Sequence, residues 1–281
     1  ALRSAGIDRH PPAPPGGRIV RDERGAPTGV LVDAAMRLVE RHLPPMDEAT
    51  RASLLLRACR ACVEVGLTAV HDAGDDRETL DALRRLDEAG RLPLRVYAMV
   101  EGGREDTRAA WLARGPYRGD RLEVRCVKLF LDGALGSRGA AFHEPYDDDP
   151  GNRGLTLLER DRFVELLRAS HAAGFQVAVH AIGDRANALA LDGFEAAGIP
   201  PGARPRIEHA QILRPADVGR AARLGAIASM QPTHCTSDMP WVEARIGARR
   251  LEGAYAWRSF LEAGVCVAFG SDFPIESPDP R

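Results

Sequence analysis

The sequence has few cysteines, no excess of either charge and no long apolar run. Its five cysteines are odd in number and lack the spacing of a disulfide framework, which excludes a disulfide-stapled secreted domain and favours a reducing, cytoplasmic location. With 38 basic and 40 acidic residues, the chain has no electrostatic reason to bind nucleic acid or an anionic membrane. No apolar run approaches the roughly 20 residues of a membrane span, and we find no secretory signal, so we expect no membrane partner.

The composition is that of a globular protein. The chain has 281 residues, of which 44% are hydrophobic and 28% charged, which fits two small domains or one large α/β barrel. Cys59 and Cys62 form a CxxC pair within an apolar, helix-like stretch. Because no second CxxC completes a zinc site, we interpret the pair as helix packing rather than as a redox or metal centre.

Short apolar strands alternate with helical segments from residue 46 onward. The expected strands begin near residues 67, 94, 123, 175, 206, 226 and 265. Continuous apolar strands separated by helices indicate parallel strands buried on both faces. Residues 1–45, with a Pro/Gly-rich stretch at 11–17, are expected to be irregular apart from a short helix at 34–42. We therefore divide the chain into an irregular, insertion-like segment at 1–45 and a partial barrel domain at 46–281.

Polar residues fall at or just after the carboxyl ends of six expected strands: His71, Lys128, His180, His209, Gln231 and Asp272. A closed barrel brings all these ends to one mouth, whereas an open doubly wound sheet spreads them along an edge. The pattern therefore favours an α/β barrel. Only seven strands are expected, so one βα unit of an eight-stranded barrel is absent.

The residue types suggest two kinds of chemistry. Two histidines and an aspartate suit a borderline divalent metal such as zinc. Lys128 lies in an apolar strand, and alternation points it away from Val127 and Leu129. Burial favours the neutral, nucleophilic amine of such a lysine. The amine then has two options: a Schiff base with a carbonyl substrate, or a carbamate formed with carbon dioxide that bridges two metals.

Four motifs resemble the amidohydrolase superfamily, and more narrowly amidohydrolase family 3, the branch of YtcJ-like and N-substituted formamide deformylase-like proteins. They are VKLFLDGALGSR at 127–138, HAIGD at 180–184, IEHAQ at 207–211 and FGSDFP at 269–274, and residues 66–72 and 230–234 agree as well. The resemblance implies a distorted (β/α)8 TIM barrel and a metal-dependent hydrolase acting on non-peptide carbon–nitrogen bonds, in an amide, formamide or cyclic amide.

The resemblance also implies a set of ligands. Lys128 would be the carbamylated bridging ligand, with carbon dioxide as the second component of the cofactor, and His180 and His209 would bind the second metal. Asp272 would bind the first metal and handle the proton of the attacking water. One or two divalent ions are implied, with zinc expected. The family's first strand, ending in His-x-His, and its flanking β-sandwich are missing from this sequence.

Four further residues are candidate substrate-binding groups: His234, Arg138, Asp132 and His71. Alternatives stay open, because Asp72 offers His71 a local hydrogen bond, and a salt bridge would fix the loop that carries Asp132 and Arg138. The acidic run at 147–149 lacks the spacing of a calcium loop, and we interpret it as a solvated turn.

We expect a cytoplasmic, metal-dependent amidohydrolase with a small-molecule substrate, and a homodimer is compatible with exposed barrel helices. An inactive or incomplete scaffold without a working metal site is the first alternative, favoured by the missing His-x-His. A Schiff-base lyase using Lys128 is the second, but it leaves His180, His209 and Asp272 unexplained.

Overall fold

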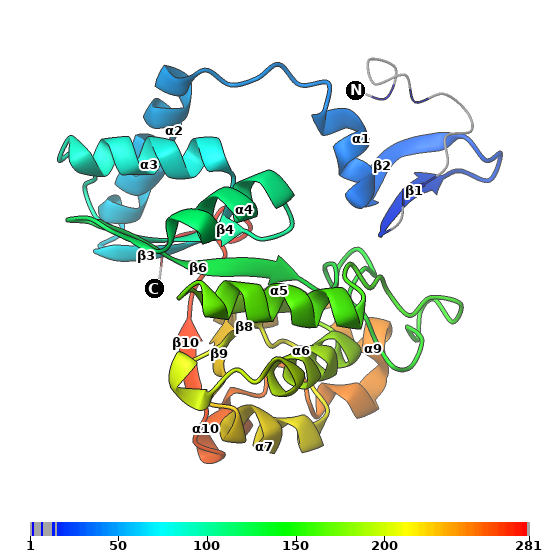
Figure 1. Cartoon of the computed structure of the whole chain (residues 1–281). Coiled ribbons are helices and arrows are strands. Elements are labelled where there is room, and N and C mark those ends of the chain that lie inside the picture. The colour runs from blue at the N-terminus through cyan, green and yellow to red at the C-terminus, as the bar shows by residue number, and fades with distance from the viewer. Residues whose placement is uncertain (1, 3–6, 8–12, 15, 280–281) are drawn as a thin grey trace.

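The computed structural model describes residues 2, 7, 13–14 and 16–279. Their main feature is one curled sheet of seven parallel strands in the order β10-β9-β8-β7-β6-β4-β3 (Figure 1). The strands are β3 Ala69–Asp75, β4 Arg95–Glu101, β6 Leu122–Phe130, β7 Gln176–Ala181, β8 Arg206–His209, β9 Ile227–Met230 and β10 Cys266–Phe269. A short β5, Tyr117–Arg118, pairs antiparallel with β6. The predicted strand number and chain order are thus confirmed.

Helices cover the convex face of the sheet. They are α2 Glu48–Glu64, α3 Arg77–Glu88, α4 Glu105–Arg114, α5 Arg160–Ala172, α6 Asp184–Ala197, α7 Pro215–Arg223 and α10 Trp257–Glu262. Two further helices, α8 Pro232–Asp238 and α9 Val242–Leu251, lie at the carboxyl ends of the strands instead, where α9 packs on residues 135–146. Asp47 and Asp76 cap α2 and α3, since each carboxylate accepts a hydrogen bond from the backbone of the third residue beyond it. The α8 and α9 helices were not expected, because residues 231–251 are polar and contain Pro232, Pro240 and the kinking Gly247.

The hydrophobic core lies between the sheet and these helices. Val127 and Leu129 of β6 belong to it, together with Phe163 and Phe194 of α5 and α6. Cys126 packs in a separate small cluster with Met99 and Ala178. The alternation predicted for β6 is therefore confirmed, and Lys128 shares the concave face of the sheet with Cys126.

Residues 17–33 correct the expectation of an irregular N-terminal segment. They form an antiparallel hairpin of β1, Gly17–Arg21, and β2, Pro27–Asp33. The Asp22 carboxylate accepts hydrogen bonds from the amides of residues 24 and 26, which builds the tight turn that the composition concealed. A 3-10 turn, Ala34–Met36, and α1, Arg37–Glu40, confirm the short helix that follows. The Pro/Gly stretch lies partly outside the described residues, and the division at residue 45 stays a prediction.

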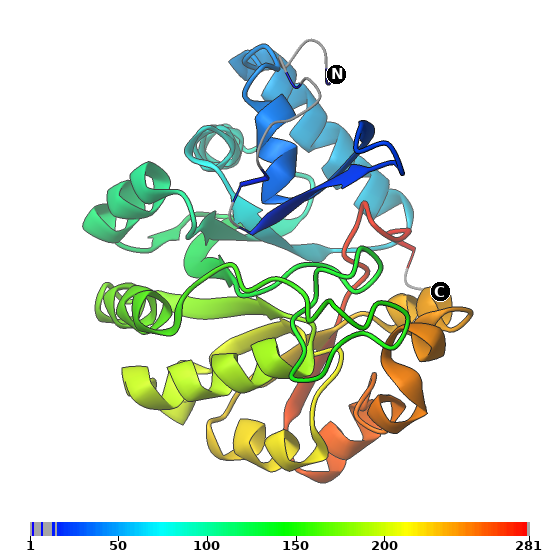
Figure 2. The same cartoon turned by 90° about the vertical axis from the view of Figure 1, so that its right-hand side faces the viewer.

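A long connection, residues 131–159, follows β6 and crosses the face at the carboxyl ends of the strands (Figure 2). Its acidic run is an ion-pair centre rather than the solvated turn that we expected. The Asp148 carboxylate accepts from Arg138 and lies 3.3 Å from Arg245 of α9, while Asp147 pairs with Arg250 at 2.6 Å. Arg245 and Arg250 of α9 thus hold the connection in place through these ion pairs.

All five cysteines are free thiols. Cys59 and Cys62 are buried on α2, and burial raises the pKa of Cys59 to about 11, which agrees with a packing role. Among the described residues, no helix has the combined length and apolar character needed to cross a membrane.

Candidate active site

The concave side of the sheet, at the carboxyl ends of its strands, holds the four predicted metal-site residues. Lys128 is near the end of β6, His180 of β7 and His209 of β8, and Asp272 follows β10. The rings of His180 and His209 have centroids 4.5 Å apart. The charges of Glu208, Asp272 and Glu101 act on the Lys128 amine. Groups separated by up to 144 positions, from Lys128 to Asp272, therefore share one electrostatic environment.

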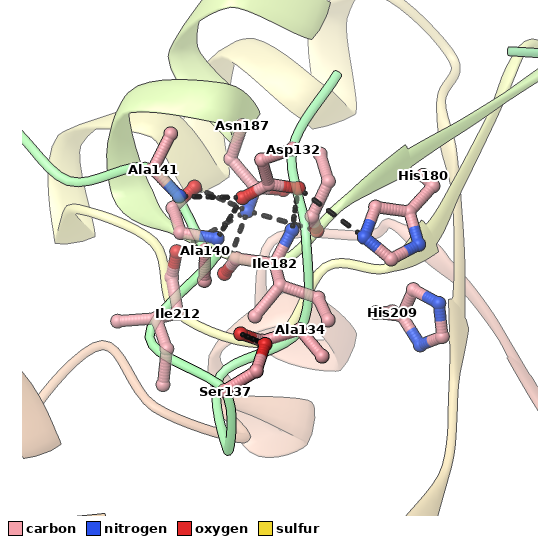
Figure 3. A network of polar contacts seen from close by, with 12 residues as sticks. Asp132, Ala134, Ser137, Ala140, Ala141, His180, Ile182, Asn187, His209 and Ile212 are labelled. Atoms are coloured by element: carbon pink, nitrogen blue, oxygen red, sulfur yellow. Dashed lines mark hydrogen bonds and ion pairs between the residues drawn. The ribbon is translucent and has the colours of Figure 1, made fainter. Parts of the chain in front are cut away.

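Each histidine has one ring nitrogen directed at a side-chain acceptor (Figure 3). The Nε2 atom of His180 lies 3.3 Å from a carboxylate oxygen of Asp132. The Nδ1 atom of His209 lies 2.8 Å from the amide oxygen of Gln231. Burial, followed by the charge of Lys128, lowers the pKa of His180 to about 3. Burial also lowers the pKa of His209 well below its ordinary value, so both imidazoles are neutral at pH 7, the form in which histidine binds metal.

Lys128 is the sole lysine of the chain, although lysine and arginine together number 38. Its side chain is buried, and its amine lies 3.6 Å from the centre of the Phe130 ring. Burial lowers its pKa to about 8, against the opposing effects of Glu208 and Asp272. An arginine keeps its proton near pH 8, where Lys128 loses its own. Lys128 therefore supplies a neutral amine that the arginines do not.

Asp272 and His234 face each other at the open side of the site. A carboxylate oxygen of Asp272 lies 4.0 Å from Nε2 of His234, which α8 carries. Burial raises the pKa of Asp272, and His234 opposes that rise. The Nδ1 atom of His234 is buried with no hydrogen-bond partner among the described residues. The two side chains, which follow different strands, therefore approach each other without a direct hydrogen bond.

Backbone strain is present at the same place, at three of the seven non-glycine residues with positive φ among the described residues. His209, Ala210 and Asp272 have φ angles of 77°, 41° and 56°, in the left-handed region that disfavours residues with a side chain. Each such residue costs on the order of 1–3 kcal/mol and persists only when its surroundings impose it. The turn after β8 and the segment after β10 are therefore held in shape by their contacts.

An ion pair inside the sheet was not predicted. Arg206 and Glu208 of β8 are both buried and pair through two hydrogen bonds, at 2.6 Å and 3.2 Å. The pKa of Glu208 is lowered, because its bonds to Arg206 outweigh the effect of burial. A signal existed in the sequence: residues two apart on a strand share a face, so Arg206 and Glu208 follow the alternation that placed Lys128.

The structure gives each candidate substrate-binding residue a partner or a position. The Nδ1 atom of His71 lies 2.9 Å from Arg206, rather than in a local contact with Asp72. Arg138 makes the salt bridge that was the alternative to substrate contact, donating to both oxygens of Asp148. The carboxylate of Asp132 accepts backbone hydrogen bonds, and His234 faces Asp272. Their substrate-binding roles stay predictions.

The donor set fits part of a metal centre. Among the described residues, no group of three or more His, Cys, Asp and Glu side chains stands close enough to hold a metal ion. His180 and His209 supply two adjacent neutral imidazoles; Gln231 orients His209 through a hydrogen bond, and Asp132 lies within ion-pair distance of His180. Lys128 adds a ligand only after conversion to a carbamate. The residues present therefore suit a metal ion without completing its coordination.

A cavity of about 1000 Å³ adjoins this site on the side of α2. It extends from Leu55 and Cys59 past His71 to Asp272. Strands β3 and β10 both border it, and within the described residues each is hydrogen-bonded to one neighbouring strand only. The sheet is thus open at the place where an eighth strand would close a barrel.

A family model described as "Amidohydrolase family" matches residues 1–281. The chain belongs to this family. It is 36% identical to the putative amidohydrolase YtcJ of Bacillus subtilis (strain 168), covering all of this chain and 53% of the relative. It is 29% identical to N-substituted formamide deformylase of Arthrobacter pascens, covering all of this chain and 54% of that protein. The chain therefore spans about half the length of these curated relatives.

The solved structures agree with the fold. An uncharacterized metal-dependent hydrolase from Pyrococcus horikoshii OT3 superposes with a TM-score of 0.81 at 29% sequence identity. The match covers 99% of this chain and 55% of the other. The amidohydrolase-family resemblance and the parallel α/β sheet of a TIM-barrel-like fold are confirmed.

Proposed function

We propose that this chain carries catalytic groups of a metal-dependent hydrolase that cleaves a non-peptide carbon–nitrogen bond in an amide, formamide or cyclic amide. The observation that carries the proposal is the pair of neutral histidines, His180 and His209. The pair lies with the buried Lys128 and with Asp272 at the carboxyl ends of the strands. The names of the formamide deformylase and of the metal-dependent hydrolase among the similar proteins support it.

His180 and His209 would hold a divalent ion, for which we expect zinc, together with the carbamate formed by Lys128 and carbon dioxide. The ion, when bound, supplies a Lewis acid that lowers the pKa of water and polarises a carbonyl oxygen. The neutral amine of Lys128 is the form that adds to carbon dioxide, and its pKa of about 8 keeps a useful fraction neutral near pH 7.

Asp272 is the proposed proton carrier. It takes a proton from the attacking water as oxygen bonds to the carbonyl carbon, and it gives that proton to the nitrogen as the C–N bond breaks. Its raised pKa suits both transfers, because a group that is too weak a base cannot accept the proton. His234, 4.0 Å away, is placed to contact the substrate.

The test is hydrolysis of a panel of N-formyl amines, N-acyl amines and cyclic amides by the purified protein with added Zn²⁺ and bicarbonate. We expect one class to be cleaved, and Asp272→Asn to lower kcat roughly 10²–10⁴-fold, since the asparagine cannot carry the proton. Asp161→Asn is the matched control, because its side chain is fully exposed on α5. Unchanged turnover by Asp272→Asn would contradict the proposal. Borohydride trapping of a substrate on Lys128 would instead favour the Schiff-base lyase.

A further inference from the structure

Two fully buried polar side chains are hydrogen-bonded to the turn that follows His180 (Figure 3). Asp132 lies just after β6 and Asn187 lies on α6, and both side chains are essentially inaccessible to solvent. Neither follows from the proposed hydrolysis, because neither belongs to the proposed set of ligands and proton carriers. Both are costly to bury unless hydrogen bonds replace those lost to water.

The hydrogen bonds of Asp132 within the described part of the chain come from backbone N–H groups. Its Oδ1 accepts from Ile182 at 3.0 Å, and its Oδ2 accepts from Gly183 at 2.9 Å and from Ala141 at 2.8 Å. Three donors from two chain segments leave the carboxylate no freedom to rotate. The same Oδ1 therefore stays directed at Nε2 of His180, 3.3 Å away.

The Nδ2 of Asn187 is surrounded by carbonyl oxygens, while its Oδ1 is buried with no hydrogen-bond partner among the described residues. Its Nδ2 lies 3.0–3.2 Å from four of them, those of Ala181, Ile182, Gly183 and Ile212. Four surrounding acceptors suit an NH₂ group and would repel the amide oxygen, so the orientation of the side chain is fixed. Ile212 belongs to the turn after β8, the strand that ends at the strained His209, and its amide also donates to the Ile182 carbonyl at 2.9 Å. Asn187 thus joins the turns that follow the two histidine-bearing strands.

We propose that Asp132 and Asn187 are positioning residues that hold His180 and His209 as one pair. The charge of the Asp132 carboxylate, 3.3 Å from Nε2 of His180, favours a proton on that nitrogen and leaves Nδ1 as the ligating atom. The hydrogen bond to Gln231 does the converse for His209. Asn187 sets the separation of the two rings by tying their turns together. That this positioning serves metal binding rests on the proposed function. The positioning of the two rings itself does not.

The first test therefore uses metal-free protein with ¹⁵N-labelled histidine, in which NMR reports which ring nitrogen carries the proton. We expect the Nε2–H form for His180 and the Nδ1–H form for His209. In Asp132→Asn the His180 signals should change to a mixture of the two forms, while those of His209 stay. The Nδ1–H form of His180 in the unaltered protein, or an unaltered His180 in Asp132→Asn, would overturn the proposal for Asp132.

The second test is Co²⁺ titration followed by visible absorption. Asn187→Leu keeps the side-chain size and removes the donors, and we expect at least a ~10-fold weaker Co²⁺ affinity together with shifted ring signals for both histidines. The control is Asn152→Leu, whose amide bonds lie within the 131–159 connection and touch neither turn. If Asn187→Leu does not fold, Asn187→Ser provides the same comparison, since its hydroxyl is too short to reach the four carbonyls.

The outcomes separate the two proposals. The expected ring forms without any Co²⁺ binding would contradict the proposed function and leave the positioning pair supported. Full Co²⁺ affinity and unchanged ring signals in folded Asn187→Leu or Asn187→Ser would overturn the role of Asn187, whatever the protein hydrolyses.

Discussion

Lys128 is a residue whose charge is unfavourable where the fold places it. Alternation along β6 was enough to predict the direction of its side chain. Val127 and Leu129 are apolar and pack on the helix-covered face, so Lys128 between them points to the opposite face. The contacts of Asp132 and Asn187 were not predictable, because their partners include backbone groups up to 51 residues away in sequence. The direction of a single side chain is thus predictable where strand alternation determines it. It is not predictable where the side chain binds a turn whose shape depends on the folded chain.

Burial of Lys128 predicts a specific dependence of stability on pH. Its pKa falls from 10.5 in the unfolded chain to about 8 in the folded one. Between these values the unfolded chain binds a proton that the folded chain lacks, so the stability contribution of Lys128 rises with pH across this window. We would measure the free energy of unfolding of the unaltered protein and of Lys128→Met in metal-free and bicarbonate-free buffer. The first minus the second should rise by roughly 3 kcal/mol between pH 8 and pH 10.5. Urea unfolding at several pH values measures it, and parallel pH profiles would show that the amine is not buried.

Gly183 shows how closely two elements meet at the site. It lies at the start of α6, and a Cβ built on it would lie 2.0 Å from the carbonyl oxygen of Ala141 in the 131–159 connection. The helices and strands that alternate along the chain were predictable from apolar runs. The connection itself was not, because it is fastened by ion pairs such as Arg138–Asp148 that no local periodicity encodes.

Gly183→Ala should therefore destabilise the protein. The added methyl group must displace backbone, which costs about 1–3 kcal/mol in a packed region. Gly151→Ala, where a Cβ would meet nothing within 4 Å, is the control and should change the free energy of unfolding by less than about 0.5 kcal/mol. Urea titration compares the two. Equal stability of both variants would mean that the connection does not press against α6.

The described part of the chain forms an open, curled sheet of the kind that closes into a barrel when an eighth strand is added. Seven strands curl, but β3 and β10 face a cavity of about 1000 Å³ instead of each other. The count of seven was foreseen because each strand is a short apolar run ended by a polar residue. Closure was not decided by the sequence, since the strand that the family resemblance implies, with its His-x-His ligands, is not in these 281 residues.

An open edge predicts uneven protection of backbone amides. In the 281-residue chain, amides of β10 should exchange with deuterium faster than those of β7, because β7 pairs on both sides and β10 pairs with β9 alone. Peptide-level mass spectrometry of exchange compares the strands. Equally slow exchange in β10 and β7 would show that another segment already covers that edge.

Metal content is the most direct test of the central claim that these strand ends form a metal-dependent hydrolytic site. Elemental analysis would compare the protein grown with bicarbonate and its Lys128→Arg variant, which keeps the positive charge but cannot form the carbamate. We predict bound divalent metal, mainly zinc, in the unaltered protein and a large loss in the variant. Metal in neither protein, or the same amount in both, would contradict the account.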